Sequence, residues 1–167
     1  DAYMGKQVKE DEAEYYTLKS IPDFTSPEIA SVKHPKSVSS NIEKVIEINN
    51  VLKAYGVHFG YRVLNEISLY VFNVKKHVGD DAKILNKAID LQIRQKVLPK
   101  LGGSQLKMQG PLLSVINALT SSKFTFDDPV SKVQGFDTSK TNYPESSSKA
   151  IRMYVNLINQ GFTSFVE

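Results

Sequence analysis

An arginine just after Gly60 is the residue of this chain whose type and position best fit chemistry on a ligand. Arg62 lies at the predicted start of an amphipathic helix, and its planar, permanently charged guanidinium suits phosphate oxygens. Glu66 follows four residues later, so the spacing is also compatible with an ion pair along one helix surface. His58 and Phe59 precede the glycine and are candidates for contact with a nucleotide base. A loop histidine and a core phenylalanine account for them equally well.

Self-contained catalysis has little support elsewhere in the sequence. The phosphate-cradling pattern GxxxxGK[ST] and the nucleophile pattern Gly-x-Ser-x-Gly are both absent. Without any cysteine, disulfides and thiolate sites are excluded, and the histidines at 34, 58 and 77 form no metal-binding cluster. The acidic pairs at 80–81 and 127–128 are explained by a helix cap and a turn. We therefore expect neither a metal site nor a catalytic centre within this chain.

The basic residues are unevenly distributed, although the formal net charge is only +3. No acidic residue lies between Leu91 and Phe126. Such a stretch favours phosphate or an acidic partner surface, and a solvated helix face is the alternative. The cations in it are Arg94, Lys96, Lys100, Lys107 and Lys123.

The apolar runs and the first residues of the sequence indicate in which cellular compartment the protein is expected. No apolar run approaches the roughly 18 residues of a membrane span, and the first residues lack the regions of a signal peptide. The sequence starts at Asp1 rather than at methionine, which favours a piece of a longer protein. We expect a cytoplasmic fragment without membrane contact.

The elements that must position Arg62 are helices. Residues 1–39 are poorly periodic and punctuated by prolines, and they predict an irregular, partly disordered N-terminal arm or insertion. Residues 40–167 predict an all-α domain, a bundle of about five helices, because apolar residues recur there at steps of three and four. The hydrophobic fraction of 41% is enough for its core.

The helix boundaries follow from capping and breaking residues. The first helix is expected over 40–55, the second from Tyr61 to the glycine at 79, and the third from the acidic pair at 80–81 to near Pro99. Pro111 is expected in the first turn of the fourth helix. A serine among 146–148 is expected to cap the last helix, which stops at Gly161.

Two connecting regions complete the expectation. Residues 120–144 predict a long loop with a short strand near 124–126, and loops of this length are often functional. Both aromatic rings of the tail, Phe162 and Phe165, are expected to pack back onto the bundle.

Three blocks of the sequence resemble, in the expected order, the carboxy-terminal helical region of McrB-type AAA+ NTPases, the motor subunits of modification-dependent restriction systems. These blocks are residues 59–67 (FGYRVLNEI), 88–103 (AIDLQIRQKVLPKLGG) and 143–153 (YPESSSKAIRM) with 161–165 (GFTSF). The second block is the most specific. The likeness covers residues 40–167 and does not extend over 1–39. The P-loop, magnesium motif and sensor one of that family are absent, as is an arginine finger, because no arginine precedes Arg62.

The resemblance implies an AAA+ lid without its catalytic core. Arg62 would be the sensor-two arginine, and His58, Phe59 and Gly60 would join it at a nucleotide held between the lid and the core. The parent protein would hydrolyse GTP or ATP with Mg²⁺, form a homo-oligomeric ring, and work with a nuclease subunit on DNA. The isolated chain would be inactive.

The remaining polar and aromatic candidates have two interpretations each. Glu66 would hold Arg62 in place. Tyr61 and Tyr70 are interpreted as core residues. A contact between subunits of a ring, or the solvated face of the third helix, would account for Asp90, Gln92, Arg94 and Lys96. The alternatives to a lid are a helical nucleic-acid-binding module that uses the stretch without acidic residues and a protein-interaction domain that uses residues 120–144.

Overall fold

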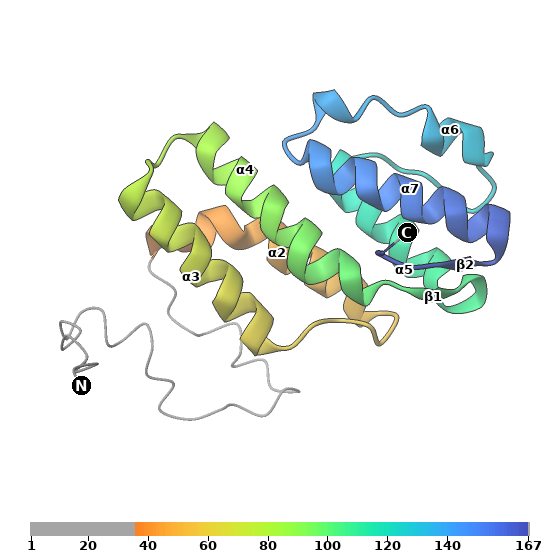
Figure 1. Ribbon diagram of the computed structural model, residues 1–167, viewed down its shortest axis with the longest axis horizontal. Coiled ribbons are helices and arrows are strands. Elements are labelled where there is room, and N and C mark those ends of the chain that lie inside the picture. Colours follow the sequence, from red (N-terminus) through yellow and green to blue (C-terminus); the bar gives the residue numbers. More distant parts are fainter. Residues whose placement is uncertain (1–35, 167) are drawn as a thin grey trace.

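Residues 36–166 are described by the computed structural model, with side chains from Ile42 onward. The predicted arm therefore lies outside the described residues, apart from its last four positions, which already belong to the first described helix. The prediction of a mainly helical domain is confirmed (Figure 1). The α-helices are α2 (Lys36–Lys53), α3 (Tyr61–His77), α4 (Ala82–Gln92), α5 (Gln105–Thr120), α6 (Val130–Gln134) and α7 (Pro144–Gln160).

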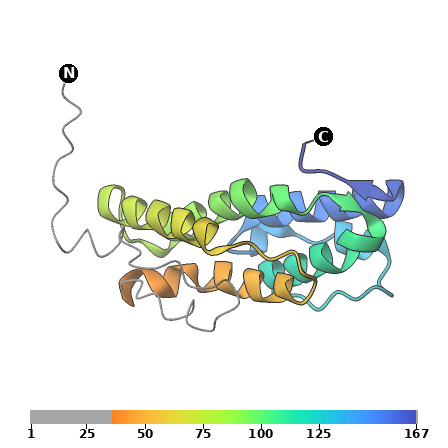
Figure 2. The ribbon, with the colours of Figure 1, turned by 90° about the horizontal axis from the view of Figure 1, so that it is seen from below.

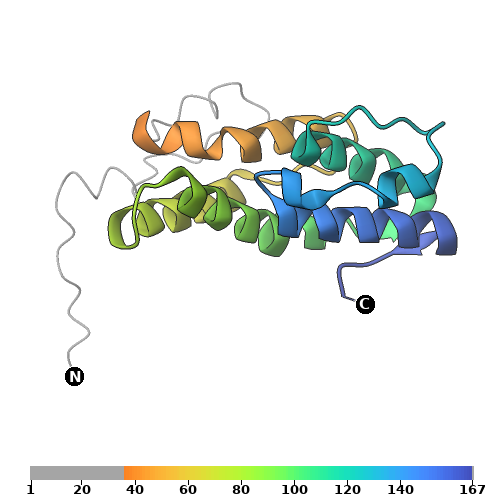
Figure 3. The same cartoon turned by 90° about the horizontal axis from the view of Figure 1, so that it is seen from above.

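The helices form two layers, which are visible when the molecule is turned on its side (Figures 2 and 3). One layer holds α2 and α5, and the other holds α3, α4 and α7. The most extensive contacts between helices join α5 to α7, α2 to α5 and α3 to α4. The core therefore lies between the layers, and α5 is its most apolar wall. Fully buried side chains there include Ile48, Leu52, Ile67, Ile93, Leu112, Ile116 and Tyr154.

The third predicted helix is not α-helical to its end. α4 stops at Gln92 and continues as a π-helical turn, η2 (Ile93–Val97), and a 3-10 turn, η3 (Leu98–Lys100). Pro99 has no N–H to donate, so the regular helical ladder cannot pass through it. The wider π turn re-aims the side chains that follow. Its residues Ile93 and Val97 are fully buried, so the turn is packed and not frayed.

The predicted start of the fourth helix was wrong. α5 begins at Gln105, so Pro111 lies inside the helix and not in its first turn. A two-stranded pairing explains the earlier start. β1 (Gly103–Ser104) pairs antiparallel with β2 (Phe162–Thr163), and the Gln105 N–H donates to the Gly161 carbonyl at 2.9 Å. This anchor begins the helix before the proline is reached.

The prediction of a strand near 124–126 was also wrong. The side-chain amide of Asn117 satisfies the backbone of Phe124 instead, with Nδ2 donating to the carbonyl and Oδ1 accepting from the N–H, each at 2.8 Å. Phe124 is buried, with its ring edge-on to Phe136 at 5.9 Å between centroids. The region between α5 and α7 is not one long loop, because it contains α6 and a 3-10 turn, η4 (Thr138–Lys140).

Two predictions about aromatic rings hold only in part. Phe165 packs against the core, and its ring lies 5.0 Å from Lys149 Nζ, whereas Phe162 is exposed. Tyr61 is buried as predicted, but Tyr70 lies at the surface. Phe162 and Tyr70 are therefore corrected from core to surface residues.

Two leucines of α5 provide a matched test of where the core lies. Leu112 is fully buried, whereas Leu106, in the first turn of the same helix, is 97% exposed. We expect Leu112→Ala to lower the free energy of unfolding in urea by about 2–5 kcal/mol, because it leaves a cavity. Leu106→Ala should change it by less than about 0.5 kcal/mol. Equal losses from both variants would contradict this assignment of the core.

Candidate functional site

The described structure places Arg62 at the surface, in the first turn of α3. Its side chain is 91% exposed, and its Nε lies 3.1 Å from Oε1 of Glu66, one turn further along. Contact through Nε leaves the terminal nitrogens of the guanidinium outside this ion pair. Arg62 therefore forms the predicted i, i+4 ion pair with Glu66, and its terminal nitrogens can still reach outward to a ligand.

Glu66 has a second partner in another element. Its Oε2 accepts from Lys96 Nζ of η2 at 2.7 Å, so one carboxylate joins two cations across α3 and the π turn. We call Arg62, Glu66 and Lys96 the α3–η2 ion cluster. Lys96 first and Arg62 second hold the pKa of the Glu66 carboxyl below its usual range. The cluster thus holds an ionised carboxylate and carries a net charge of about +1 at neutral pH.

The other predicted nucleotide contacts separate into surface and core residues. His58 and Gly60 are exposed beside Arg62, on the connection that leads into α3. Phe59 is buried, and its N–H donates to Asn49 Oδ1 of α2 at 2.8 Å. The structure therefore supports the core interpretation of Phe59, because its ring is packed in the bundle and is not presented to a ligand.

The start of α3 carries no side-chain cap. Gly60 is the N-cap residue and has no side chain to accept from the first-turn N–H groups. Such open N–H groups, together with the positive end of the helix dipole, favour an anion near a helix start. They lie in the same turn as Arg62, so their electrostatic effect adds to that of the guanidinium.

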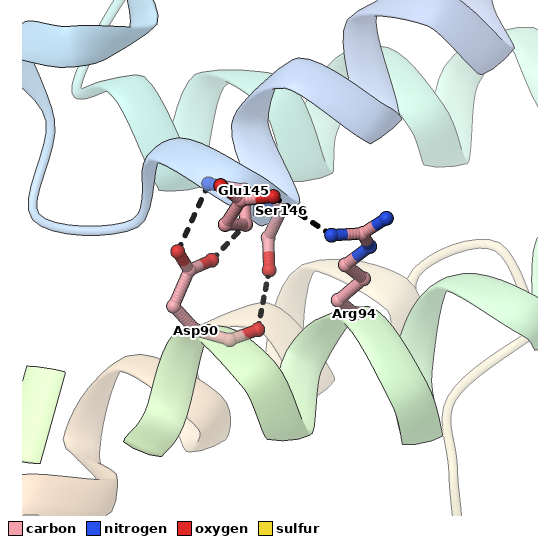
Figure 4. A network of polar contacts seen from close by, with 4 residues as sticks. All are labelled: Asp90, Arg94, Glu145 and Ser146. Carbon is pink, nitrogen blue, oxygen red and sulfur yellow. Dashed lines mark hydrogen bonds and ion pairs between the residues drawn. The ribbon is translucent and has the colours of Figure 1, made fainter. Parts of the chain in front are cut away.

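A buried carboxylate joins α4 to the start of α7. Asp90 of α4 is only 2% exposed, and its carboxylate accepts from the backbone N–H groups of Glu145 at 2.9 Å and Ser146 at 2.8 Å (Figure 4). The Ser146 hydroxyl donates back to the Asp90 carbonyl at 2.7 Å. Asp90 therefore caps the start of α7 from a different helix, and the predicted serine cap was wrong.

Arg94 adds a surface ion pair beside this cap. Its Nη1 lies 2.7 Å from Glu145 Oε2, so η2 is tied to α7 as well as to α3. Asp90 and Gln92 are buried, which contradicts their assignment to a subunit contact or to a solvated helix face. Arg94 and Lys96 are partly exposed, but each is paired within the chain.

These contacts bring the three sequence blocks together. Glu66 and Lys96 join the first block to the second, and Asp90 and Ser146 join the second to the third. The β1–β2 pairing joins the end of the second block, at Gly103, to residues 161–165. One feature of the sequence indicated a cap from another element. Pro144 starts α7, so Tyr143 is the N-cap residue, and its side chain does not accept from the first-turn N–H groups.

Other kinds of site have less support in residues 36–166. Of the five cations in the stretch without acidic residues, Arg94 and Lys96 are paired with carboxylates, which weakens the case for a phosphate-binding surface there. Within the part of the chain that the structure describes, no three His, Asp or Glu side chains gather as a metal site would require. None of the described helices combines the length and apolar character needed to cross a membrane.

The described residues thus define a helical domain with an exposed arginine in an ion cluster and a buried cap between helices. The chain belongs to the family described as "Domain of unknown function (DUF8727)", whose model matches residues 12–162. No curated protein and no solved structure shows a significant match to this chain. The family match begins within the predicted N-terminal arm and includes residues 59–67, 88–103 and 143–153, but only the first two residues of 161–165.

The cap by Asp90 leads to a stability prediction. Asp90→Ala should lower the free energy of unfolding by about 3 kcal/mol, because it leaves two N–H groups at the α7 start without an acceptor. Asp90→Asn should cost less, because one oxygen remains. The control is Asp81→Ala, which removes only the cap of α4, a bond of 2.8 Å from Lys83 N–H, and should cost about 1 kcal/mol. Urea unfolding measures all three, and an Asp90→Ala effect no larger than that of Asp81→Ala would disprove the central role of the cap.

Proposed function

We propose that this chain is the helical lid of an McrB-like AAA+ NTPase and contributes Arg62 as the sensor-two arginine of nucleotide hydrolysis. The setting would be DNA restriction or a related defence function in the cytoplasm. The observation that carries the proposal is the 91% exposed side chain of Arg62 within a sequence block whose apolar residues are packed. An arginine exposed in this way is accessible to a ligand, and its planar, permanently charged guanidinium suits phosphate oxygens.

The mutual contacts of the three blocks support the same proposal. Sequence likeness alone could come from unrelated stretches, but these blocks are linked to one another through Glu66–Lys96, Asp90–Ser146 and Gly103–Thr163. They therefore act as one scaffold that positions the start of α3. A lid needs such a scaffold, because it must move as a body relative to the nucleotide-binding core.

The chemistry assigned to Arg62 is electrostatic. GTP or ATP would lie between the lid and a core domain, with the guanidinium at the terminal phosphate and His58 and Gly60 on the same surface. Loss of that phosphate removes the contact and lets the lid shift, which converts hydrolysis into motion. Mg²⁺ would be held by carboxylates of the core, since the described residues gather no cluster of metal ligands. The parent would assemble as a ring, act with a nuclease subunit and contact DNA.

A protein-interaction module is the second candidate, favoured by a specific observation. Leu106 and Phe126 are large apolar side chains at the surface, exposed by 97% and 60% respectively, and Phe126 lies in the region 120–144. Their exposure fits a contact with another protein more directly than a contact with nucleic acid. Replacing both by serine would abolish such a contact, whereas Arg62→Ala would leave it intact.

The first prediction from the lid proposal concerns the chain by itself. The purified 167-residue chain should hydrolyse neither ATP nor GTP in the presence of Mg²⁺, because it has no P-loop to hold the phosphates. A phosphate-release assay measures this, with buffer alone as the reference. Turnover that follows the chain through purification would refute the lid proposal.

The second prediction concerns Arg62 in the NTPase that would carry this lid. Arg62→Ala should lower kcat by about tenfold to a hundredfold, because a preorganised charge at the terminal phosphate is lost. The thermal midpoint should stay unchanged, since the side chain is exposed. Lys123→Ala removes another exposed cation and serves as the control. An unchanged kcat in the Arg62 variant would make it a surface residue without a role in hydrolysis.

A further inference from the structure

Lys96 and Arg62 contact the same carboxylate, that of Glu66, each through a different oxygen. We propose that Lys96 is a positioning residue for Arg62: it keeps Glu66 compensated, so that Arg62 can leave the carboxylate for an anion. The identity of that anion as a nucleotide phosphate rests on the proposed function. The ion cluster itself is a feature of this chain.

The charges of the cluster give the first argument. An isolated Arg62–Glu66 pair would be neutral and would hold the guanidinium in place, with little net attraction for an anion. Lys96 restores a net charge of about +1 and occupies Oε2 of Glu66. When Arg62 turns away, the carboxylate keeps a cationic donor at 2.7 Å and is not left uncompensated. Releasing Arg62 is therefore easier with Lys96 present than without it.

The way each cation is anchored gives the second argument. Lys96 belongs to η2, whose neighbouring residues Ile93 and Val97 are fully buried, so its backbone is held by the core. Arg62 belongs to the uncapped first turn of α3, and its side chain is 91% exposed. Glu66 therefore has one partner whose side chain is 42% exposed and one whose side chain is 91% exposed, so Arg62 is the less confined of the two. The same order is found in its pKa, which Lys96 lowers more than Arg62 does.

A static role is the alternative explanation. The three side chains could simply fasten α3 to η2, as surface ion pairs do, although such exposed pairs contribute little to stability. The two explanations differ in what they predict for Arg62. A fastening role changes the thermal midpoint, whereas a positioning role changes Arg62 function and does so only while Glu66 is present.

The first test uses the 167-residue chain and NMR detection of the Glu66 carboxyl carbon and the Arg62 Nε–H. Lys96→Met should raise the pKa of Glu66 towards its usual range by more than Arg62→Met does. It should also slow the exchange of the Arg62 Nε–H with water, because Glu66 then binds Arg62 alone. Lys96→Arg should behave like the native chain. An unchanged Glu66 pKa and an unchanged exchange rate in Lys96→Met would overturn the inference.

The second test measures hydrolysis in the NTPase that would carry this lid. Lys96→Met should lower kcat about threefold to tenfold, a coupling typical of residues that act through a neighbour. It should have no further effect in a Glu66→Gln background, where Arg62 is already released. The matched control is Lys100→Met, which removes one exposed positive charge four residues away.

The outcomes separate the two proposals. If Arg62→Ala lowers kcat but Lys96→Met does not, or if the Lys96 effect persists with Glu66→Gln, the positioning role is overturned and the lid proposal stands. If Arg62→Ala itself leaves kcat unchanged, both are overturned. Loss of kcat in Lys96→Met together with a lowered thermal midpoint, without rescue by Lys96→Arg, would identify a fastening role instead.

Discussion

The buried carboxylate of Asp90 is the interaction on which the arrangement of this molecule depends. Burying a carboxylate is costly unless it is hydrogen-bonded, and here the two N–H groups at the α7 start and the positive end of that helix supply the compensation. The start of α7 depends on this carboxylate, because α7 has no N-cap side chain of its own. The contact thus fixes the distance and orientation of α7 relative to α4.

The consequences of this contact extend to the surface through a short chain of elements. Asp90 lies three residues before the π turn η2, so fixing α4 against α7 also fixes the positions of Arg94 and Lys96. Arg94 then pairs with α7 and Lys96 with α3. The π turn is therefore the hub between three helices, which fits the frequent occurrence of such turns at functional sites. Arg62 stands at the outer end of this chain of contacts.

Periodicity and capping rules predicted the helical class and most helix positions, because apolar residues at steps of three and four are a local property of the sequence. What they missed depends on distant residues. Asp90 was interpreted as part of a subunit contact or of a solvated helix face, since nothing nearby explains a carboxylate in a core, and its partners are more than fifty residues away. Pro111 was placed at a helix start because the β1–β2 anchor is equally non-local. Arg62 was identified from its type and its place after a glycine. Its link to Lys96 was not, because η2 and α3 meet only in the folded chain.

The distribution of the block residues between core and surface argues for a division of tasks. Asp90, Ser146, Phe59 and Leu101 are buried, so their presence in the blocks is explained by folding alone. Arg62 has no such explanation, since removing an exposed cation disturbs neither packing nor a cap. Its neighbours nevertheless maintain an environment around it: an uncapped helix start, a carboxylate at 3.1 Å and a second cation that keeps this carboxylate neutralised. The terminal nitrogens of the Arg62 guanidinium stay outside the ion pair with Glu66, in the same turn as the uncapped N–H groups of α3.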